Sequence, residues 1–169
     1  MRPSTISLCI IVMAILLNAC SSGLNAPTSS EGAKGSANSA PLPGSAYKAS
    51  ITPVNPPATL KAGEPASLTV KVKNVGNGTW PAQGLGPKYK VDLGNHWFDT
   101  KGTEVAGDDG RSPLPHDLKA GEEAELLLRV KPPKTPGNYV LVLDMVHEDV
   151  TWFALRGSPT VKLNVTVQE

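Results

Sequence analysis

The sequence predicts an all-β protein, an antiparallel sandwich of about seven short strands. Several segments after residue 46 alternate apolar and polar residues, which is typical of strands with one buried face. Gly and Pro each occur 16 times in the 169 residues, and such residues punctuate the alternating segments. No segment of ten or more residues shows a convincing helical period. These observations favour two packed layers of strands, an immunoglobulin-like β-sandwich.

The strands are expected in a regular succession from about Tyr47 onward. Clear alternation occurs in 67–74, 89–97, 124–130 and 160–167, and 50–54 and 152–155 are shorter candidates. The segment 139–147 is apolar at both parities up to Val142, as expected of a strand covered on both sides. Turns are predicted at Asn77-Gly78, Asp109-Gly110, Ala120-Gly121 and Pro136-Gly137. The alternation predicts these inward-facing side chains: Leu68, Val70, Val72, Tyr89, Val91, Leu93, Trp97, Ala124, Leu126, Leu128, Val130, Val161, Leu163, Val165 and Val167.

Four stretches of this domain carry a family resemblance. They read "NVGNGTWPAQG", "LGNHWFDTKG", "GRSPLPHDLKAGE" and "PGNYVLVLDMVHEDVTWFALRGSP". In this order they resemble the immunoglobulin-like domain often found beside bacterial glycosyltransferases and methyltransferases, over roughly residues 50–168. A fainter resemblance is to the four-tryptophan domain of autophagy receptors, although this chain has three tryptophans. The first resemblance implies a non-catalytic accessory module.

The N-terminal segment is typical of an export signal. Arg2 is the only charge in residues 1–19, and the apolar core at 6–17 is too short to span a bilayer of ~30 Å. The stretch Leu17-Asn18-Ala19-Cys20 resembles the lipobox of bacterial lipoproteins. That resemblance implies a lipid-modified Cys20 thiol, with palmitate-type acyl chains, and cleavage just before it. A stray cysteine after an ordinary signal peptide is the alternative.

Cysteine usage supports the lipidation of Cys20. The sequence has two cysteines, and Cys9 would leave with the signal peptide. Cys20 would then have no partner for an internal disulfide. Ser21 follows it, and in Gram-negative lipoproteins a residue other than Asp at this position usually implies the outer membrane, here facing the periplasm.

Residues 21–46 are expected to form a disordered linker. They contain almost no bulky apolar side chain, so they cannot offset the entropy of ordering. Their typical reach is about 5–6 Å times the square root of 26, or roughly 30 Å. The predicted organisation is a signal peptide at 1–19, a lipidated cysteine and linker at 20–46, and a β-sandwich at 47–169.

Charge and motifs argue against several function classes. Without residues 1–19 the chain keeps 15 basic residues (16 less Arg2) against 15 acidic ones, and this balance argues against nucleic acid as a partner. His147-Glu148 is followed by Thr151 where a zinc protease helix needs a second histidine. His96, His116 and His147 are far apart in sequence, so we predict no metal site, no cofactor and no enzyme.

Aromatic side chains are the remaining binding candidates. Trp97 falls on the inward side of its strand and is expected in the core. Trp80 precedes Pro81 near a turn, where it could cap the core or stack on a ligand, and we favour the cap. Trp152 and Phe153 are neighbours, so in a simple strand only one can point inward. Either the other offers a ligand-stacking surface, or the segment folds over the sandwich edge and buries both.

Two functional hypotheses follow from these features. The first is a non-enzymatic cell-envelope lipoprotein whose immunoglobulin-like domain is a protein-interaction or assembly module. The second is a carbohydrate-binding module that recognises envelope or extracellular polysaccharide through exposed Trp80, Trp152 or Phe153. In both, the N-terminal lipid of Cys20 attaches the chain to a membrane.

Overall fold

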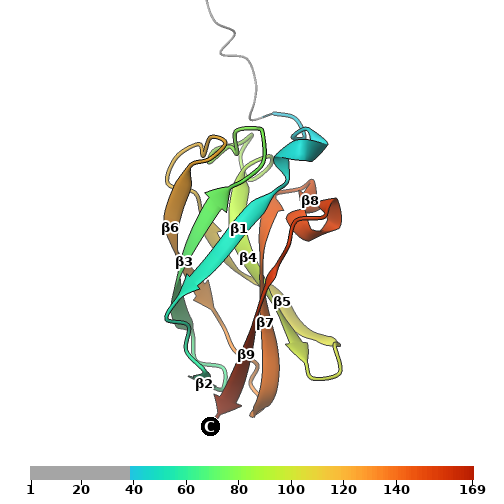
Figure 1. Ribbon diagram of the computed structural model, residues 1–169. Helices are drawn as coiled ribbons and strands as arrows, with labels where there is room; N and C mark the ends of the chain where they lie inside the picture. The colour runs from blue at the N-terminus through green and yellow to red at the C-terminus, as the bar shows by residue number, and fades with distance from the viewer. Residues whose placement is uncertain (1–38) are drawn as a thin grey trace, which may run out of the picture. The chain divides into compact units, whose positions relative to one another are not determined.

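The computed structural model describes residues 39–169, without the side chains of Asp108 and Asp109. The predicted signal peptide, Cys20 and most of the predicted linker lie outside the described residues. Over 39–169 the chain forms two β-sheets and two short 3-10 helices (Figure 1). None of the helices in this range is long and apolar enough to cross a bilayer.

The fold is the predicted all-β sandwich. The smaller sheet has the order β1-β3-β6, and the larger sheet has the order β2-β9-β7-β4-β5, with β8 paired to β7. Every paired neighbour is antiparallel except β2 and β9, which are parallel. The elements are η1 (Gly44–Ala46), β1 (Ala49–Val54), β2 (Thr59–Lys61), β3 (Ala66–Asn74), β4 (Val91–Asp99), β5 (Glu104–Pro113), β6 (Glu123–Val130), β7 (Gly137–His147), β8 (Thr151–Trp152), η2 (Phe153–Arg156) and β9 (Val161–Gln168). Residues 39–169 thus contain nine strands where about seven were expected, because β2 and β5 were not predicted. The turn expected at Asp109-Gly110 is wrong, since both residues lie within β5.

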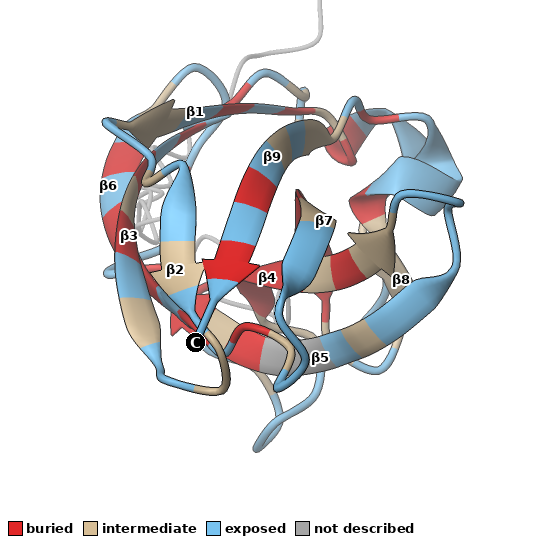
Figure 2. Cartoon of the chain, turned by 90° about the horizontal axis from the view of Figure 1, so that it is seen from below, coloured by how far each residue is buried: buried red, intermediate tan, exposed pale blue. Residues whose placement is uncertain are grey.

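The hydrophobic core lies between the two sheets and follows the predicted alternation. Buried and exposed residues alternate along β6 throughout and along the second half of β9 (Figure 2). Trp97 is wholly buried, as predicted. The predicted inward positions that are buried are Leu68, Val70, Val72, Val91, Leu93, Trp97, Ala124, Leu126, Leu128, Val130, Val165 and Val167.

Three predicted inward positions differ. Val161 and Leu163 are half-buried, although both pack against the core. The prediction for Tyr89 is wrong, because its φ of 64° is left-handed and β4 begins only at Val91. A left-handed residue cannot continue the alternation of a strand. Tyr89 therefore belongs to the connection that enters β4, and its ring is half-buried.

The folded domain extends further towards the N-terminus than residue 47. Ala46 is wholly buried, and the partly buried Leu42 packs against the core. Residues 43–46 form the η1 turn, in which the Ala46 amide donates to the Pro43 carbonyl at 2.9 Å. These residues were assigned to the linker because none of them is bulky. Of the four, only Ala46 is buried, and its burial depends on residues distant in the sequence such as Trp80.

Candidate functional site

His147 is a structural group of the core. Its side chain is wholly buried at the end of β7. The hydroxyl of Tyr47 lies 2.9 Å from Nδ1 and the carbonyl of Tyr89 lies 3.0 Å from Nε2. Since a carbonyl only accepts, Nε2 carries the proton and Nδ1 accepts from Tyr47. Burial lowers the pKa of His147, opposed by the hydrogen bond to Tyr89. Both ring nitrogens are therefore engaged within the fold.

Two of the three candidate stacking aromatics are buried. Trp80 and Phe153 are wholly inaccessible to solvent. Their rings meet edge to face with centroids 5.1 Å apart, and the Trp80 indole donates to the Ala46 carbonyl at 2.8 Å. Neither ring can stack on a ligand, which corrects the stacking hypothesis at these two positions. Trp80 has instead the favoured role of a cap that closes the core.

Trp152 is the candidate that stays partly exposed. Its ring lies over Gly94 of β4, where a Cβ atom would come within 2.7 Å of the indole. The Arg111 guanidinium lies over the ring at 4.8 Å, and the His96 ring centroid is 4.2 Å away. Only a residue without a side chain allows this close approach. Trp152 is thus held on the outer face of the larger sheet.

Outward-facing residues of β4 and β7 form the base of a hollow beside Trp152. The register pairs Gly94 with Asp144 and His96 with Val142, so these residues point away from the core. The η2 segment covers Asp144 from the side, since the Ala154 amide donates to its Oδ2. We call this ≈ 250 Å³ space the outer-face hollow. It is lined by His96, Phe98, Glu104, Val142, Asp144, Trp152, Ala154, Leu155 and Thr160.

The outer-face hollow adjoins two further depressions. One has ≈ 340 Å³ and shares Trp152 and Leu155 with it, and the other also has ≈ 340 Å³ and shares Phe98 and Val142. The three together follow the outer face of the larger sheet. The three depressions therefore form one continuous irregular surface, with the outer-face hollow in the middle.

Asp144 is the most unusual ionisable group of the outer-face hollow. It is 2% exposed, its Oδ2 accepts from the Ala154 amide at 3.0 Å, and its Oδ1 has no hydrogen-bond partner. Burial raises the pKa of Asp144 to about 6, partly opposed by the Ala154 and Met145 amides and by His96. Nearby, His96 Nδ1 lies 2.8 Å from Glu104 Oε1. The hollow thus combines apolar walls with a buried carboxylate that is short of donors.

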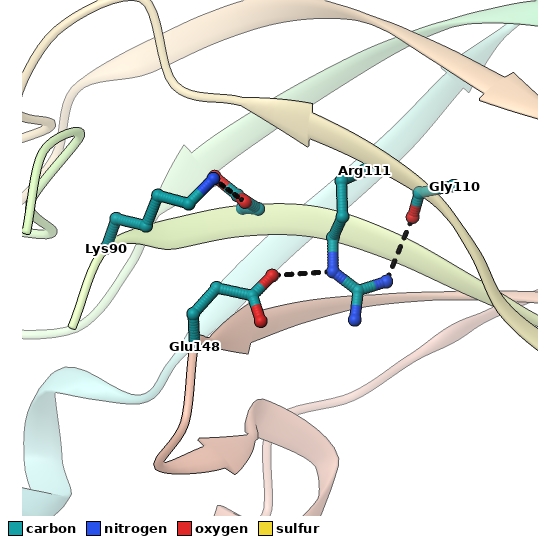
Figure 3. Close-up of polar contacts among 5 residues, drawn as sticks. Lys90, Gly110, Arg111 and Glu148 are labelled. Carbon is teal, nitrogen blue, oxygen red and sulfur yellow. Dashed lines mark hydrogen bonds and ion pairs between the residues drawn. The ribbon is translucent and has the colours of Figure 1, made fainter. Parts of the chain in front are cut away.

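Two basic groups beside the hollow are paired with acids. Arg111 Nε lies 2.6 Å from Glu148 Oε1 and its Nη1 donates to the Gly110 carbonyl at 3.0 Å (Figure 3). These two contacts hold the guanidinium over Trp152. Lys90 Nζ lies 2.6 Å from an oxygen of Asp92, whose side chain is wholly buried.

Sequence reasoning did not find the outer-face hollow. Of its residues only Trp152 was a candidate, and Asp144 was hidden in an apolar strand. The sequence offered one indication, an acidic residue within the apolar 139–147 segment. Burial of a charged side chain is unfavourable unless the charge is paired or hydrogen-bonded. No group of three or more His, Cys, Asp or Glu residues arranged for a metal ion occurs among the residues that the structure describes.

The raised pKa of Asp144 has a consequence for stability. Since the pKa is 3.8 in the unfolded chain and about 6 in the fold, the folded state binds the proton more tightly. The contribution of Asp144 to the free energy of unfolding is therefore fully present below about pH 4 and is lost as the pH rises through 6. We expect Asp144→Asn to raise the free energy of unfolding at about pH 7.5 by about 1 kcal/mol, reduced from the full linkage value by screening.

Urea denaturation of the wild type and Asp144→Asn at about pH 4 and about pH 7.5 measures this effect. Asparagine keeps an oxygen for the Ala154 amide, so the difference should vanish at the lower pH. Glu125→Gln is the control, because it removes an exposed carboxylate on β6 of the other sheet. A gain of equal size at both pH values would contradict the assignment of a buried, titrating Asp144.

Comparisons with known proteins leave the family open. No family model matches the sequence, and a comparison with curated proteins finds no match either. Solved structures match this chain with low sequence identities and TM-scores. The CARDB domain of a Pyrococcus furiosus protein, in complex with di-metal ions, has 17% identity and a TM-score of 0.41, with 72% of this chain and 86% of that chain covered.

Two other solved structures match this chain with similarly low sequence identities and TM-scores. The sporulation control protein Spo0M from Bacillus subtilis has 15% identity and a TM-score of 0.45, with 72% of this chain and 50% of that chain covered. A conjugative transposon lipoprotein from Bacteroides eggerthii has 9% identity and a TM-score of 0.37, with 70% and 97% covered. These values carry no argument about function, so the sandwich is established by its own strand order and register.

Proposed function

We propose that this chain is a non-enzymatic, lipid-anchored protein of the bacterial cell envelope whose sandwich binds another envelope protein. The observation that carries the proposal is an exposed apolar and aromatic surface at the outer-face hollow. Leu155 is 77% exposed beside the half-buried Trp152. Exposed apolar groups around an aromatic side chain and framed by charges are typical of protein interfaces.

The proposed attachment places this surface near a membrane. Lipid on Cys20 would hold the chain, and the stretch up to the folded domain would give it a reach of roughly 30 Å. Ser21 favours the outer membrane in a Gram-negative cell. The formally neutral mature chain favours a protein partner over nucleic acid.

The side chains of the outer-face hollow favour binding over covalent catalysis. None of its lining residues is Ser, Cys or Lys, the usual nucleophiles. His147 lies outside the hollow and has both nitrogens engaged in the core. Reproducible hydrolase or transferase activity of the purified protein would overturn the non-enzymatic proposal.

Carbohydrate binding is the second candidate. Trp152 beside the carboxylates of Asp144 and Glu104 favours it, since sugars are bound by aromatic rings and polar side chains. However, the stacking face expected from three aromatics is not formed, and Arg111 already lies over the Trp152 ring. A protein partner uses the exposed Leu155 as well, and we prefer it for that reason.

Photo-crosslinking in the source cells tests the proposed interface. A benzophenone amino acid in place of Leu155 should give a discrete crosslinked species with an envelope protein. The matched control replaces Leu127, which is 64% exposed on β6 of the smaller sheet. Equal crosslinking at both positions, or none at Leu155, would contradict the interface. A heterogeneous product that glycosidases remove would favour carbohydrate.

A further inference from the structure

We infer that the outer-face hollow takes a basic side chain, lysine or arginine, from the partner protein. This inference rests on the proposed function and specifies the chemistry of the contact. Three features of the hollow carry it. They are a buried acceptor without a partner, a wall of aromatic rings, and an excess of negative groups.

The unpartnered acceptor is Oδ1 of Asp144. The side chain is 2% exposed, and Oδ2 accepts a hydrogen bond from the Ala154 amide. The Met145 amide is the other backbone donor that acts on this carboxyl group. An ionised carboxylate can accept on the order of four hydrogen bonds. A buried charge with so few donors is unfavourable unless it is paired with an opposite charge. An ammonium or guanidinium group supplies both the missing donors and the charge.

Aromatic rings line the space next to this carboxylate. The centroid of the His96 ring is 4.2 Å from that of Trp152 and 6.3 Å from that of Phe98. Both Phe98 and Trp152 are half-buried, so each still presents some surface. Cations are attracted to such rings, and the methylene stem of lysine or arginine packs well on apolar walls.

The charge balance of the hollow also favours a cation. Its lining includes Asp144 and Glu104, and none of the lining residues is Lys or Arg. His96 is the one lining group that can become positive, and it is hydrogen-bonded to Glu104. Arg111 is paired with Glu148 and Lys90 with Asp92 (Figure 3), and Lys162 lines the adjoining depression but not the hollow itself. A neutral sugar would leave the buried charge without a counterion.

Titration of the full-length protein in detergent micelles tests this inference. The probe is the peptide acetyl-Gly-Arg-Gly-amide, and the neutral control has citrulline in place of arginine. The readout is the indole N–H resonance of Trp152, assigned by its loss in Trp152→Phe. We expect a saturable shift with the arginine peptide and an affinity at least about tenfold lower for the citrulline peptide. The buried indoles of Trp80 and Trp97 are internal controls.

A variant pair separates the carboxylate from general charge effects. Asp144→Asn should weaken binding of the arginine peptide by at least about tenfold, and Glu125→Gln should leave it unchanged. Because Asp144→Asn is expected to be at least as stable as the wild type near neutral pH, loss of binding would not reflect unfolding. A substitution that raises the free energy of unfolding but weakens ligand binding is typical of a position with a functional role.

Other outcomes would overturn the inference. Equal affinity for arginine and citrulline peptides, or unchanged binding in Asp144→Asn, would remove the role of charge. A Trp152 shift with cellotetraose but not with the arginine peptide would favour carbohydrate. If Leu155 still crosslinks to an envelope protein while the peptide does not bind, the proposed function remains and only the basic side chain is excluded. Failure of both experiments would remove both.

Discussion

Trp80→Ala is expected to lower the free energy of unfolding by about 3–5 kcal/mol, the range typical of deleting a large aromatic side chain from a core. The Trp80 side chain is wholly buried. Its indole donates to the Ala46 carbonyl at 2.8 Å, so the alanine variant would also leave a buried acceptor unpaired. The cavity and the unpaired carbonyl both act against the folded state.

The loss should spread beyond one side chain because Trp80 connects three segments. Its backbone pairs with Leu118 in both directions at 2.9 Å. Its ring meets Phe153 of η2 edge to face, and Phe153 in turn meets Tyr47 with centroids 5.1 Å apart. We therefore expect Trp80→Ala to loosen η1 and η2 as well as the 74–84 connection.

Denaturant unfolding of matched variants measures this effect. Trp80→Phe keeps part of the ring volume but removes the donor, so its loss should be intermediate. Trp152→Ala removes the same side chain from a half-buried position, and we expect a loss of about 1 kcal/mol. Equal losses for Trp80→Ala and Trp152→Ala would contradict the assignment of Trp80 to the core and of Trp152 to the surface.

Cys20→Ser is expected to release the protein from the membrane fraction. Each buried methylene of an acyl chain contributes about 0.8 kcal/mol, so two or three chains make attachment stable where one does not. Serine cannot carry the thioether-linked lipid that the lipobox resemblance implies. Cys20 lies outside the residues that the structure describes, so this expectation depends on the sequence alone.

Fractionation of cells and mass measurement of the mature chain test the anchor. The wild type should sediment with membranes and carry a lipid mass on its N-terminal cysteine, whereas Cys20→Ser should lack both properties. Cys9→Ser is the matched control, because Cys9 would leave with the signal peptide and its loss should not release the protein. Continued membrane association of Cys20→Ser, or release by Cys9→Ser, would contradict lipidation at Cys20.

Alternation in the sequence predicted the central strands well. Leu68, Val70 and Val72 are buried in β3, and the same period locates the buried side of β6. The reason is local: a strand with one face on a core must alternate apolar and polar residues whatever its partners are. The positions of most strands, their buried faces and the sandwich class could therefore be predicted from residue order. The segments of β2 and β5 lack a clear alternation and were missed.

Two predictions assumed a continuing strand. One of Trp152 and Phe153 was expected to point inward, and Phe153 is buried while Trp152 is half-buried. The backbone is not extended there, however, because Phe153 begins η2, which ends at the left-handed Gly157. Successive side chains in a 3-10 turn differ by roughly 120°, not 180°. Phe153 is therefore in the core while Trp152 lies over Gly94. Tyr89 was misplaced for a similar reason, its left-handed backbone.

The sequence by itself determined most of the segments that become strands, which face of most of them is buried, and which cysteine is the predicted anchor. Only the tertiary structure decided the burial of Ala46 and Asp144 and the existence of the outer-face hollow. These features depend on the register of β4 against β7 and on the placement of η2 over Asp144. The register joins Gly94 to Asp144 fifty positions away, and the η2 contact reaches back ten positions across a turn. No local period records which of these residues will meet.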